Sequence, residues 1–374
     1  MIYLDNAATT KVTDSAAMAA AEMMTENFYN PNATYKSGVA VKSYIESCRK
    51  DIAKYIGAED KELYFTSCAT ESNNWVFSYG RKRQNGNIVI SAGEHSAVYE
   101  PAMRLKNHGI DVRVAKLDKS GCVDTDDVLR LVDDNTSLVS VIHVSNETGV
   151  VNPIKDLCAK VKRKAPGALF HSDGVQGVLK TGEPIDSLGV DYYSVSAHKL
   201  GAPKGIGLLY VNKKLNIAPM LLGGGQERGL RSGTQNTPYI AAFAAAVKEF
   251  CATRDIKATL MLRNKLIDIF TEAGGVVVGD WQNSGYILCM MLDGAKAEIV
   301  QNAAFDKGVI IGKGAACSGS KRGNRVLSAM GLSDKQVECC VRISFSNDTV
   351  TDDAVKAAKI ILDCADAIRR GNVR

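Results

Sequence analysis

The stretch YYSVSAHKLGAPKGIGLLYV, residues 192–211, joins two apolar runs through a turn that contains glycine and proline. Both runs are rich in aliphatic and aromatic residues, which is typical of buried strands, and glycine and proline favour a turn between them. The first run ends in Ser196, His198 and Lys199. The sequence therefore predicts two buried strands, with a lysine delivered at the edge of their sheet.

The same pattern of short apolar runs and helical segments extends over most of the chain. Helical periodicity is clearest in residues 39–57, where Gly57 is the expected C-cap, and recurs in residues 124–134 and 154–165. Strands that alternate with helices indicate a mostly parallel sheet with helices on both faces, an α/β fold. The expected strands are residues 63–67, 87–91, 111–117, 138–145, 168–173, 192–196 and 206–211.

The character of the sequence changes near residue 250. A long helical pattern runs to about residue 273, and shorter apolar runs and a final helix follow it. We find no repeat, no low-complexity segment and no flexible linker between the two parts. A second, smaller α+β domain is therefore expected from about residue 251 to the end.

Composition narrows the class of protein. The chain has 374 residues, of which 45% are hydrophobic and 23% are charged, as in an ordinary globular protein. Its formal net charge of +5 gives only weak support for direct binding to nucleic acid. Its ten cysteines include no CxxC pair, so neither a zinc ribbon nor a thioredoxin-type motif is present. Because neither a signal peptide nor a membrane span is visible, we expect a cytoplasmic protein with reduced thiols.

Polar side chains follow five of the expected strands, where ligands of open α/β sheets bind. A hydroxyl at the start of a helix can cradle a phosphate, although a single threonine there is as well explained by helix capping. Polar residues after so many strands of one sheet are harder to explain by capping alone. The residues concerned are Ala69, Thr70, His95, Asn146, Asp173, Gln176, Ser196, His198 and Lys199.

Lys199 suggests what these groups bind. An amine that can lose its proton forms a Schiff base with a carbonyl, although a surface lysine in a turn is the simpler interpretation. If the carbonyl belongs to pyridoxal phosphate, Asp173 would keep the pyridine nitrogen protonated. Thr70 and Ser196 would then hold the phosphate, and His95 could lie on the ring and move a proton.

The chain also resembles a known family over nearly its whole length. It is similar to the cysteine desulfurases, the NifS/IscS-like branch of the class V aminotransferase group. The matching motifs are YLDNAATT, FTSCATESNN, EHSAV, SNETGVVNPI, HSDGVQ, SAHKLGAPKGIGLLYV, GGGQERGLRSGTQNTP, GAACSGS and VRISFS. The resemblance implies a fold-type I PLP-dependent transferase, with a large domain over residues 13–250 and a small domain over residues 1–12 and 251–374.

The resemblance also implies a role for each site residue. Lys199 would bind the cofactor, with His95 stacked on the pyridine ring, Asp173 on its nitrogen and Gln176 on its oxygen. Asn146 and Arg342 would hold the substrate carboxylate, which suits the planar fork of an arginine. The phosphate contacts would be Ala69, Thr70, Ser196, His198 and, from the neighbouring subunit of a homodimer, Thr234.

Cys317 is the expected nucleophile. It lies in a Gly-, Ser- and Ala-rich stretch near several lysines and arginines, which favour the reactive thiolate. By the resemblance, L-cysteine is converted to L-alanine and a persulfide forms on Cys317, for transfer to an acceptor. We expect the other nine cysteines to be inert packing residues.

Some features depart from the family pattern and leave alternatives open. Cys68, Gln226 and Tyr35 stand where glycine and two histidines are common, and the segment after Cys317 is shorter than usual. The chain ends soon after its last helix, so a tRNA sulfurtransferase is as plausible an acceptor as an iron–sulfur scaffold. The alternatives are a selenocysteine lyase, another class V enzyme and a non-catalytic sulfur-relay protein. An NAD-binding enzyme is excluded because no G-x-G-x-x-G motif follows the first strand.

Overall fold

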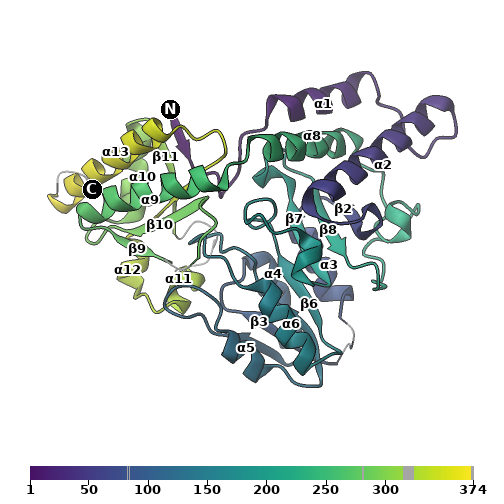
Figure 1. Cartoon of the computed structure of the whole chain (residues 1–374), viewed down its shortest axis with the longest axis horizontal. Coiled ribbons are helices and arrows are strands. Elements are labelled where there is room, and N and C mark those ends of the chain that lie inside the picture. The colour runs from purple at the N-terminus through teal and green to yellow at the C-terminus, as the bar shows by residue number, and fades with distance from the viewer. Residues whose placement is uncertain (82, 84, 280–281, 315–323, 372–374) are drawn as a thin grey trace.

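The structure is a computed structural model that describes residues 1–374 except 82, 84, 280–281, 315–323 and 372–374. It contains two sheets, each covered by helices, which form the two lobes seen side by side in Figure 1. The N- and C-terminal ends both lie on the smaller lobe, at the left of that view.

The large lobe is built on a seven-stranded sheet with the order β2-β8-β7-β6-β5-β3-β4. Its neighbours from β4 to β7 are parallel, and β8 runs antiparallel to both β7 and β2. This confirms the predicted α/β fold with a mostly parallel seven-stranded sheet. The strands are β2 (Leu63–Thr66), β3 (Asn87–Ser91), β4 (Val112–Ala115), β5 (Thr136–Ser140), β6 (Leu169–Asp173), β7 (Tyr192–Ser196) and β8 (Gly207–Val211).

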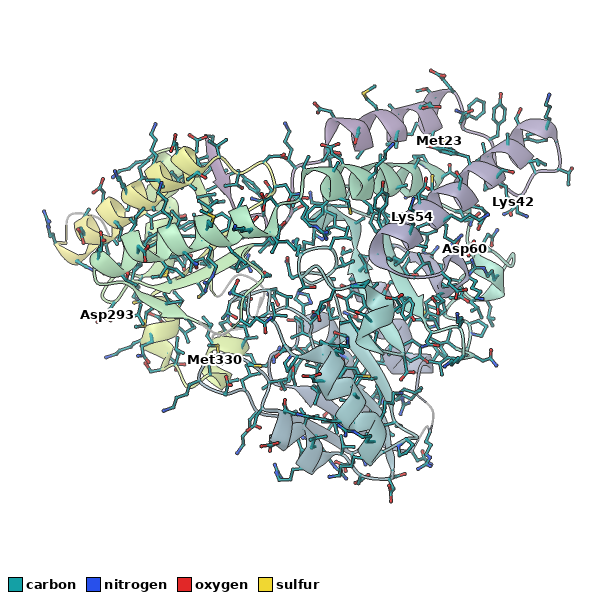
Figure 2. All side chains as sticks on the ribbon, viewed as in Figure 1. Met23, Lys42, Lys54, Asp60, Asp293 and Met330 are labelled. Carbon is teal, nitrogen blue, oxygen red and sulfur yellow. The ribbon has the colours of Figure 1, made fainter. Side chains whose placement is uncertain are left out.

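Both faces of this sheet are apolar, because successive side chains of each strand point to opposite sides. Leu169 packs with α3 and α4, whereas the next residue, Phe170, packs with the helices of the other face. Met23 of α1, labelled in Figure 2, belongs to that second face. The helices are α1 (Asp14–Thr25), α2 (Lys36–Ile56), α3 (Ala69–Tyr79), α4 (Ser96–Asn107), α5 (Thr125–Leu131), α6 (Ile154–Lys164), α7 (Ile185–Leu188) and α8 (Thr237–Thr253), with short 3-10 turns η1 (Asp60–Glu62), η2 (Ala197–Lys199) and η3 (Glu227–Gly229).

The small lobe has a five-stranded sheet with the order β1-β11-β12-β10-β9 and its own apolar core. The first strand of the chain, β1, pairs in parallel with β11, so residues from both ends of the sequence share this sheet. The strands are β1 (Ile2–Leu4), β9 (Val276–Val278), β10 (Ile287–Met291), β11 (Val309–Lys313) and β12 (Cys340–Ser344), and the helices of this part are α9 (Ile256–Glu272), α10 (Ala297–Asp306), α11 (Arg325–Ala329), α12 (Asp334–Glu338) and α13 (Thr351–Arg369).

Several element boundaries differ from the sequence prediction, and the largest shift is in β5. The expected strand 138–145 ends at Ser140. Beyond it, Val141 and His143 still donate to backbone oxygens of β6, but the backbone N–H of Ile142, on the other side of the strand, donates to the Glu94 carboxylate at 2.8 Å. The helical pattern expected from about residue 251 to 273 is α9, which begins at Ile256 because Asp255 caps its N-terminus through the backbone N–H of Ala258 at 2.9 Å. Gly57 does end α2 in the left-handed conformation, with φ of 71°.

Candidate active site

The carboxyl end of β6 places a buried carboxylate at the centre of the site. Asp173 is 2% exposed and accepts hydrogen bonds from the Asn73 side chain at 2.9 Å and from the backbone N–H of Val175 at 3.1 Å. Asn73 is a buried residue of α3. These contacts fix the carboxylate without neutralising it, so it is suited to a cationic ligand atom such as a protonated pyridine nitrogen.

Lys199 lies one strand away, just after β7. Its ammonium donates to the backbone oxygens of Ala7 at 2.5 Å and Ala8 at 2.7 Å. Gln176 also donates to the oxygen of Ala7, at 3.0 Å. The segment between β1 and α1 therefore covers the lysine and holds its amine through two backbone carbonyl groups, and this amine can react when it loses its proton.

His95 is the N-cap of α4, and this position fixes its tautomer. Its Nδ1 accepts from the backbone N–H of Ala97 at 3.1 Å, so the neutral ring carries its hydrogen on Nε2. Burial lowers the pKa of His95, the Asp173 carboxylate opposes that change, and the cations of Lys199, Arg325 and Arg342 add to it. The ring is therefore neutral at pH 7 and offers an N–H donor.

The first turn of α3 and the end of β7 carry residues that are expected to bind the phosphate. α3 begins at Ala69 as predicted, and within the described residues the side chain of its N-cap, Cys68, makes no capping hydrogen bond. The N–H groups of this turn and the Thr70 hydroxyl can therefore serve an anion. Ser196 is buried at the end of β7, and burial together with nearby lysines lowers the pKa of His198 to about 4.

Arg342 of β12 brings the small lobe to this edge. Its guanidinium donates to the backbone oxygen of Asn146 at 3.0 Å and to the Asp5 carboxylate at 3.1 Å, and it lies 4.0 Å from Glu147. Asn146 and Arg342 are thus neighbours, as their predicted shared role requires. At Gly312, a Cβ would lie 2.8 Å from the Asp5 carboxylate and 3.0 Å from the guanidinium, so only glycine leaves the pair undisturbed.

Cys317 lies outside the described residues, but the residues that follow its segment are well defined. The Asn324 amide donates to Glu147 at 2.8 Å and its oxygen caps α11. The guanidinium of Arg325 donates to the backbone oxygens of Ala92 and Glu94 and lies 4.0 Å above the Tyr99 ring. Because its guanidinium is held in this way, Arg325 fixes the start of α11 beside the segment that contains His95.

Thr234 lines a cavity whose lining does not include the other predicted phosphate ligands of the same chain. It lines a cavity of about 190 Å³ with Ser67 and Gly205. The Gln226 side chain accepts from the backbone N–H of Gly233 at 2.9 Å and so ties this loop together. Tyr35 also stands where histidine is common in the family. It is exposed at the start of α2.

The described cysteines are mostly buried, with Cys68 and Cys251 half-buried. Burial raises the pKa of Cys48 and Cys122 to about 11 each, and that of Cys158 to about 12. These three thiols are protonated at neutral pH and therefore poor nucleophiles. In the part of the chain that the structure describes, no helix is long and apolar enough to cross a bilayer.

Comparisons with known proteins give the family. The sequence model "Aminotransferase class-V" matches residues 2–356. The chain belongs to this family. Within it, a cysteine desulfurase IscS of Methanosarcina thermophila is 32% identical over 98% of this chain and 93% of its own length. A solved NifS-like protein superposes with a TM-score of 0.88 at 32% identity, covering 97% of this chain and 98% of that one.

A second solved structure, described as SspA in complex with cysteine, has a TM-score of 0.83 and is 30% identical, covering 94% of this chain and all of that one. The chain is therefore a PLP-dependent enzyme of the cysteine desulfurase type. Its residues fit pyridoxal phosphate: a buried carboxylate, an amine and a helix N-terminus meet at one edge of the sheet.

Three residues of this site were not singled out from the sequence. Asn73, Asp5 and Glu147 lie within motifs that carry the family resemblance, but their contacts to Asp173 and Arg342 are long-range. The sequence offered one signal that these residues belong to the site: each is a polar residue inside a family motif. Nothing in the sequence around each residue indicated which partner it would meet.

Proposed function

We propose that this desulfurase releases L-alanine from L-cysteine and keeps the sulfur as a persulfide on Cys317. The observation that carries the proposal is that Lys199 and Asp173 follow adjacent strands, β7 and β6, at one edge of the sheet. When bound there, pyridoxal phosphate supplies an electron sink for the bonds at the substrate Cα. The residues of the chain bind, orient and move protons around it.

Each side chain has a proposed part. Asp173 holds the pyridine nitrogen, Gln176 the ring oxygen and Lys199 the aldehyde carbon, and Lys199 then takes the proton from the substrate Cα. Arg342 and Asn146 orient the substrate carboxylate, as their contact at 3.0 Å allows. The phosphate is assigned to Ala69, Thr70, Ser196 and His198, and to Thr234 of the neighbouring subunit.

His95 is assigned to a further proton transfer. Because its Nδ1 accepts from the backbone of α4, the neutral ring presents Nε2–H toward its surroundings. To give up this proton readily, the ring must first be protonated on Nδ1, which costs the capping hydrogen bond. The lowered pKa of His95 makes that protonated form a strong acid.

The sulfur step balances without a further reactant. The Cys317 thiolate attacks the substrate sulfur, an S–S bond forms and the C–S bond breaks. The electrons of the C–S bond stay with the carbon, which takes up a proton and becomes the methyl group of alanine. We propose that the acceptor of the persulfide is an iron–sulfur scaffold or a tRNA sulfurtransferase. We also propose that the protein is cytoplasmic.

We also propose the homodimer and the domain division 13–250 against 1–12 and 251–374. Support for the division comes from the separate core of the small lobe and from the pairing of β1 with β11. Support for the dimer comes from Thr234, which lines its own cavity, and from Leu222 of the same loop, which is 87% exposed. Sedimentation at working concentration tests the dimer, and a monomer would contradict the shared phosphate site.

The central test compares wild type with Cys317→Ala, using Cys251→Ala as the matched control. Each protein is incubated with L-cysteine, and alanine and reductant-released sulfide are measured. Cys317→Ala should bind the cofactor and lose both products, whereas Cys251→Ala should behave as wild type. Full sulfide release by Cys317→Ala would refute the persulfide. Selenocysteine supplied in parallel distinguishes a selenocysteine lyase, which the comparisons do not favour.

A further inference from the structure

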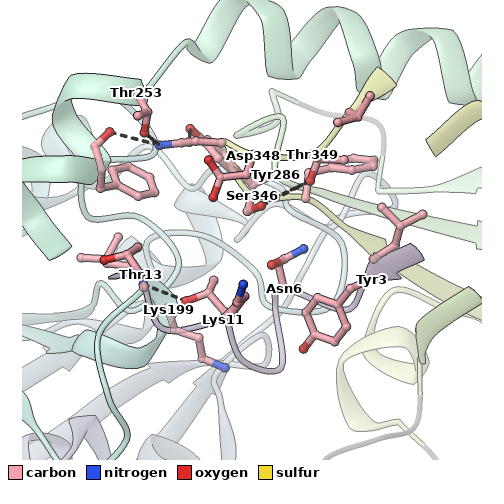
Figure 3. A pocket seen from close by; sticks show the side chains of 18 of the residues that line it. Tyr3, Asn6, Lys11, Thr13, Lys199, Thr253, Tyr286, Ser346, Asp348 and Thr349 are labelled. Carbon is pink, nitrogen blue, oxygen red and sulfur yellow. Dashed lines mark hydrogen bonds between the residues drawn. The ribbon is translucent and has the colours of Figure 1, made fainter. Parts of the chain in front are cut away.

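A second lysine, buried unlike Lys199, is linked to the same site. Lys180, at the end of the turn that follows β6, is 3% exposed. Its ammonium donates to Oε1 of Gln176 at 3.0 Å and lies 5.5 Å from the centre of the Tyr286 ring, which belongs to the small lobe. It also lines the cavity of about 260 Å³ shown in Figure 3, between the N-terminal segment and residues 345–350.

These contacts form a chain that ends at the reactive lysine. Lys180 donates to Gln176, Gln176 donates through Nε2 to the oxygen of Ala7 at 3.0 Å, and Lys199 donates to the same oxygen at 2.5 Å. Three of these residues, Lys180, Gln176 and Ala7, are buried. The catalytic amine and the buried lysine are thus joined through one amide and one carbonyl.

The chemistry of the two ends leaves one orientation for the Gln176 amide. An ammonium has only donors, so it must face Oε1, and a backbone carbonyl has only acceptor capacity, so it must face Nε2. Without Lys180, Oε1 would lose its donor, and the orientation of the amide would depend on the Ala7 carbonyl alone. A reversed amide would place an oxygen where a donor is needed.

We propose that Lys180 is a positioning residue, which fixes the Gln176 amide so that its N–H groups face Ala7 and the cofactor's ring oxygen. The proposal rests on the assignment of Gln176 to that oxygen made above. Burial, with the Lys199 charge adding to it, lowers the pKa of Lys180 to about 7. The orienting role belongs to the charged ammonium, because a neutral amine could also accept a hydrogen bond from the amide N–H.

The visible absorption of the bound cofactor gives a direct readout. An N–H donated to the ring oxygen favours the more negatively charged form, so its loss should raise the pH midpoint of the absorption change by roughly 0.5 to 1 unit. Lys180→Met should raise the midpoint, and Lys180→Arg, which keeps a donor-only group, should restore it. Lys160→Met, an exposed lysine of α6, is the matched control and should leave it unchanged.

A double variant separates this role from a structural one. Gln176→Ala alone should raise the midpoint, and adding Lys180→Met should change it no further. A normal midpoint in Lys180→Met, or an additive shift in the double variant, would overturn the proposal. An unchanged midpoint in Gln176→Ala would contradict the role of Gln176 in the proposed function, and this proposal with it. If Lys180→Met does not fold, Lys180→Gln, which accepts as well as donates, should show the same rise.

Discussion

The cofactor edge and the substrate edge of this active site are built in different ways. The cofactor edge, with Asp173 and Lys199, belongs to one sheet: Asp173 is the last residue of β6, and Lys199 ends the short 3-10 turn that follows β7. The substrate edge depends on Arg342, a strand residue of the other sheet, which meets Asp5 from the start of the chain and Asn146 from the large lobe. Three segments far apart in the sequence must therefore meet to form it.

The difference affects how each edge should tolerate change. At the cofactor edge the backbone is fixed by the ladder of parallel strands, so substitutions should alter chemistry more than structure. At the substrate edge a buried cation is held by two carboxylates and a carbonyl, so substitutions should alter binding and lobe packing together.

The largest effect is expected at the cofactor edge, from Lys199→Ala. Loss of the amine removes the covalent attachment and the base, so alanine formation should fall by about 10³-fold or more, while the melting temperature changes little. Product assays and thermal melts measure the two effects. Lys204→Ala, exposed on the same turn, is the control. A large loss of stability in Lys199→Ala would contradict the expectation that substitutions at the cofactor edge alter chemistry more than structure.

Arg342→Met should affect both binding and stability. Without the guanidinium, the substrate carboxylate and Asp5 lose their cation, so KM for cysteine should rise by about 10- to 100-fold and stability should fall by roughly 2 kcal/mol. Steady-state kinetics and denaturant unfolding measure these changes. Arg342→Lys keeps the charge but not the planar fork and should recover part of the stability. Unchanged stability in Arg342→Met would contradict the contrast between the edges.

Gly312→Ala tests the substrate edge without removing a charge. The new methyl group would press on the Asp5 carboxylate and the Arg342 guanidinium. We expect a several-fold higher KM with kcat less affected, since only the geometry of the pair changes. Gly167→Ala, where a Cβ meets only the end of an arginine side chain at 3.8 Å, is the control. Equal kinetics in the two variants would show that the pair adapts freely.

The smallest effect is expected beneath the cofactor edge, at Glu94. Burial raises its pKa to about 8, with hydrogen bonds from Ser91 and Ile142 opposing the change. A raised folded-state pKa means that this group's contribution to stability is complete below pH 4.5 and declines as the pH rises toward 8.

Glu94→Gln keeps a neutral side chain of the same shape, so its stability should depend less on pH between 5 and 8. Thermal melts across this range measure the slope, with the exposed Glu298→Gln as control. A slope equal to wild type would mean that Glu94 is charged in the folded protein.

Sequence patterns placed the residues of the proposed cofactor edge near the ends of strands, because those strands are easy to recognise in the sequence. Apolar runs revealed the strands around Asp173, Ser196 and Lys199, and the rule that ligands bind at the carboxyl ends of parallel strands brought the residues together. The error at 138–145 arose where a distant side chain, Glu94, took a backbone hydrogen bond that no local pattern contains.

The sequence by itself determined the two-lobed α/β architecture, the family and the place of Lys199 after a buried strand, since these depend on local periodicity and on motifs that lie within single segments. Only the tertiary structure decided that Asp5 would pair with Arg342, that Asn73 would hold Asp173, and that Lys180 would orient Gln176. Such contacts join segments through space, and the direction of a buried polar side chain depends on the partners that folding brings to it.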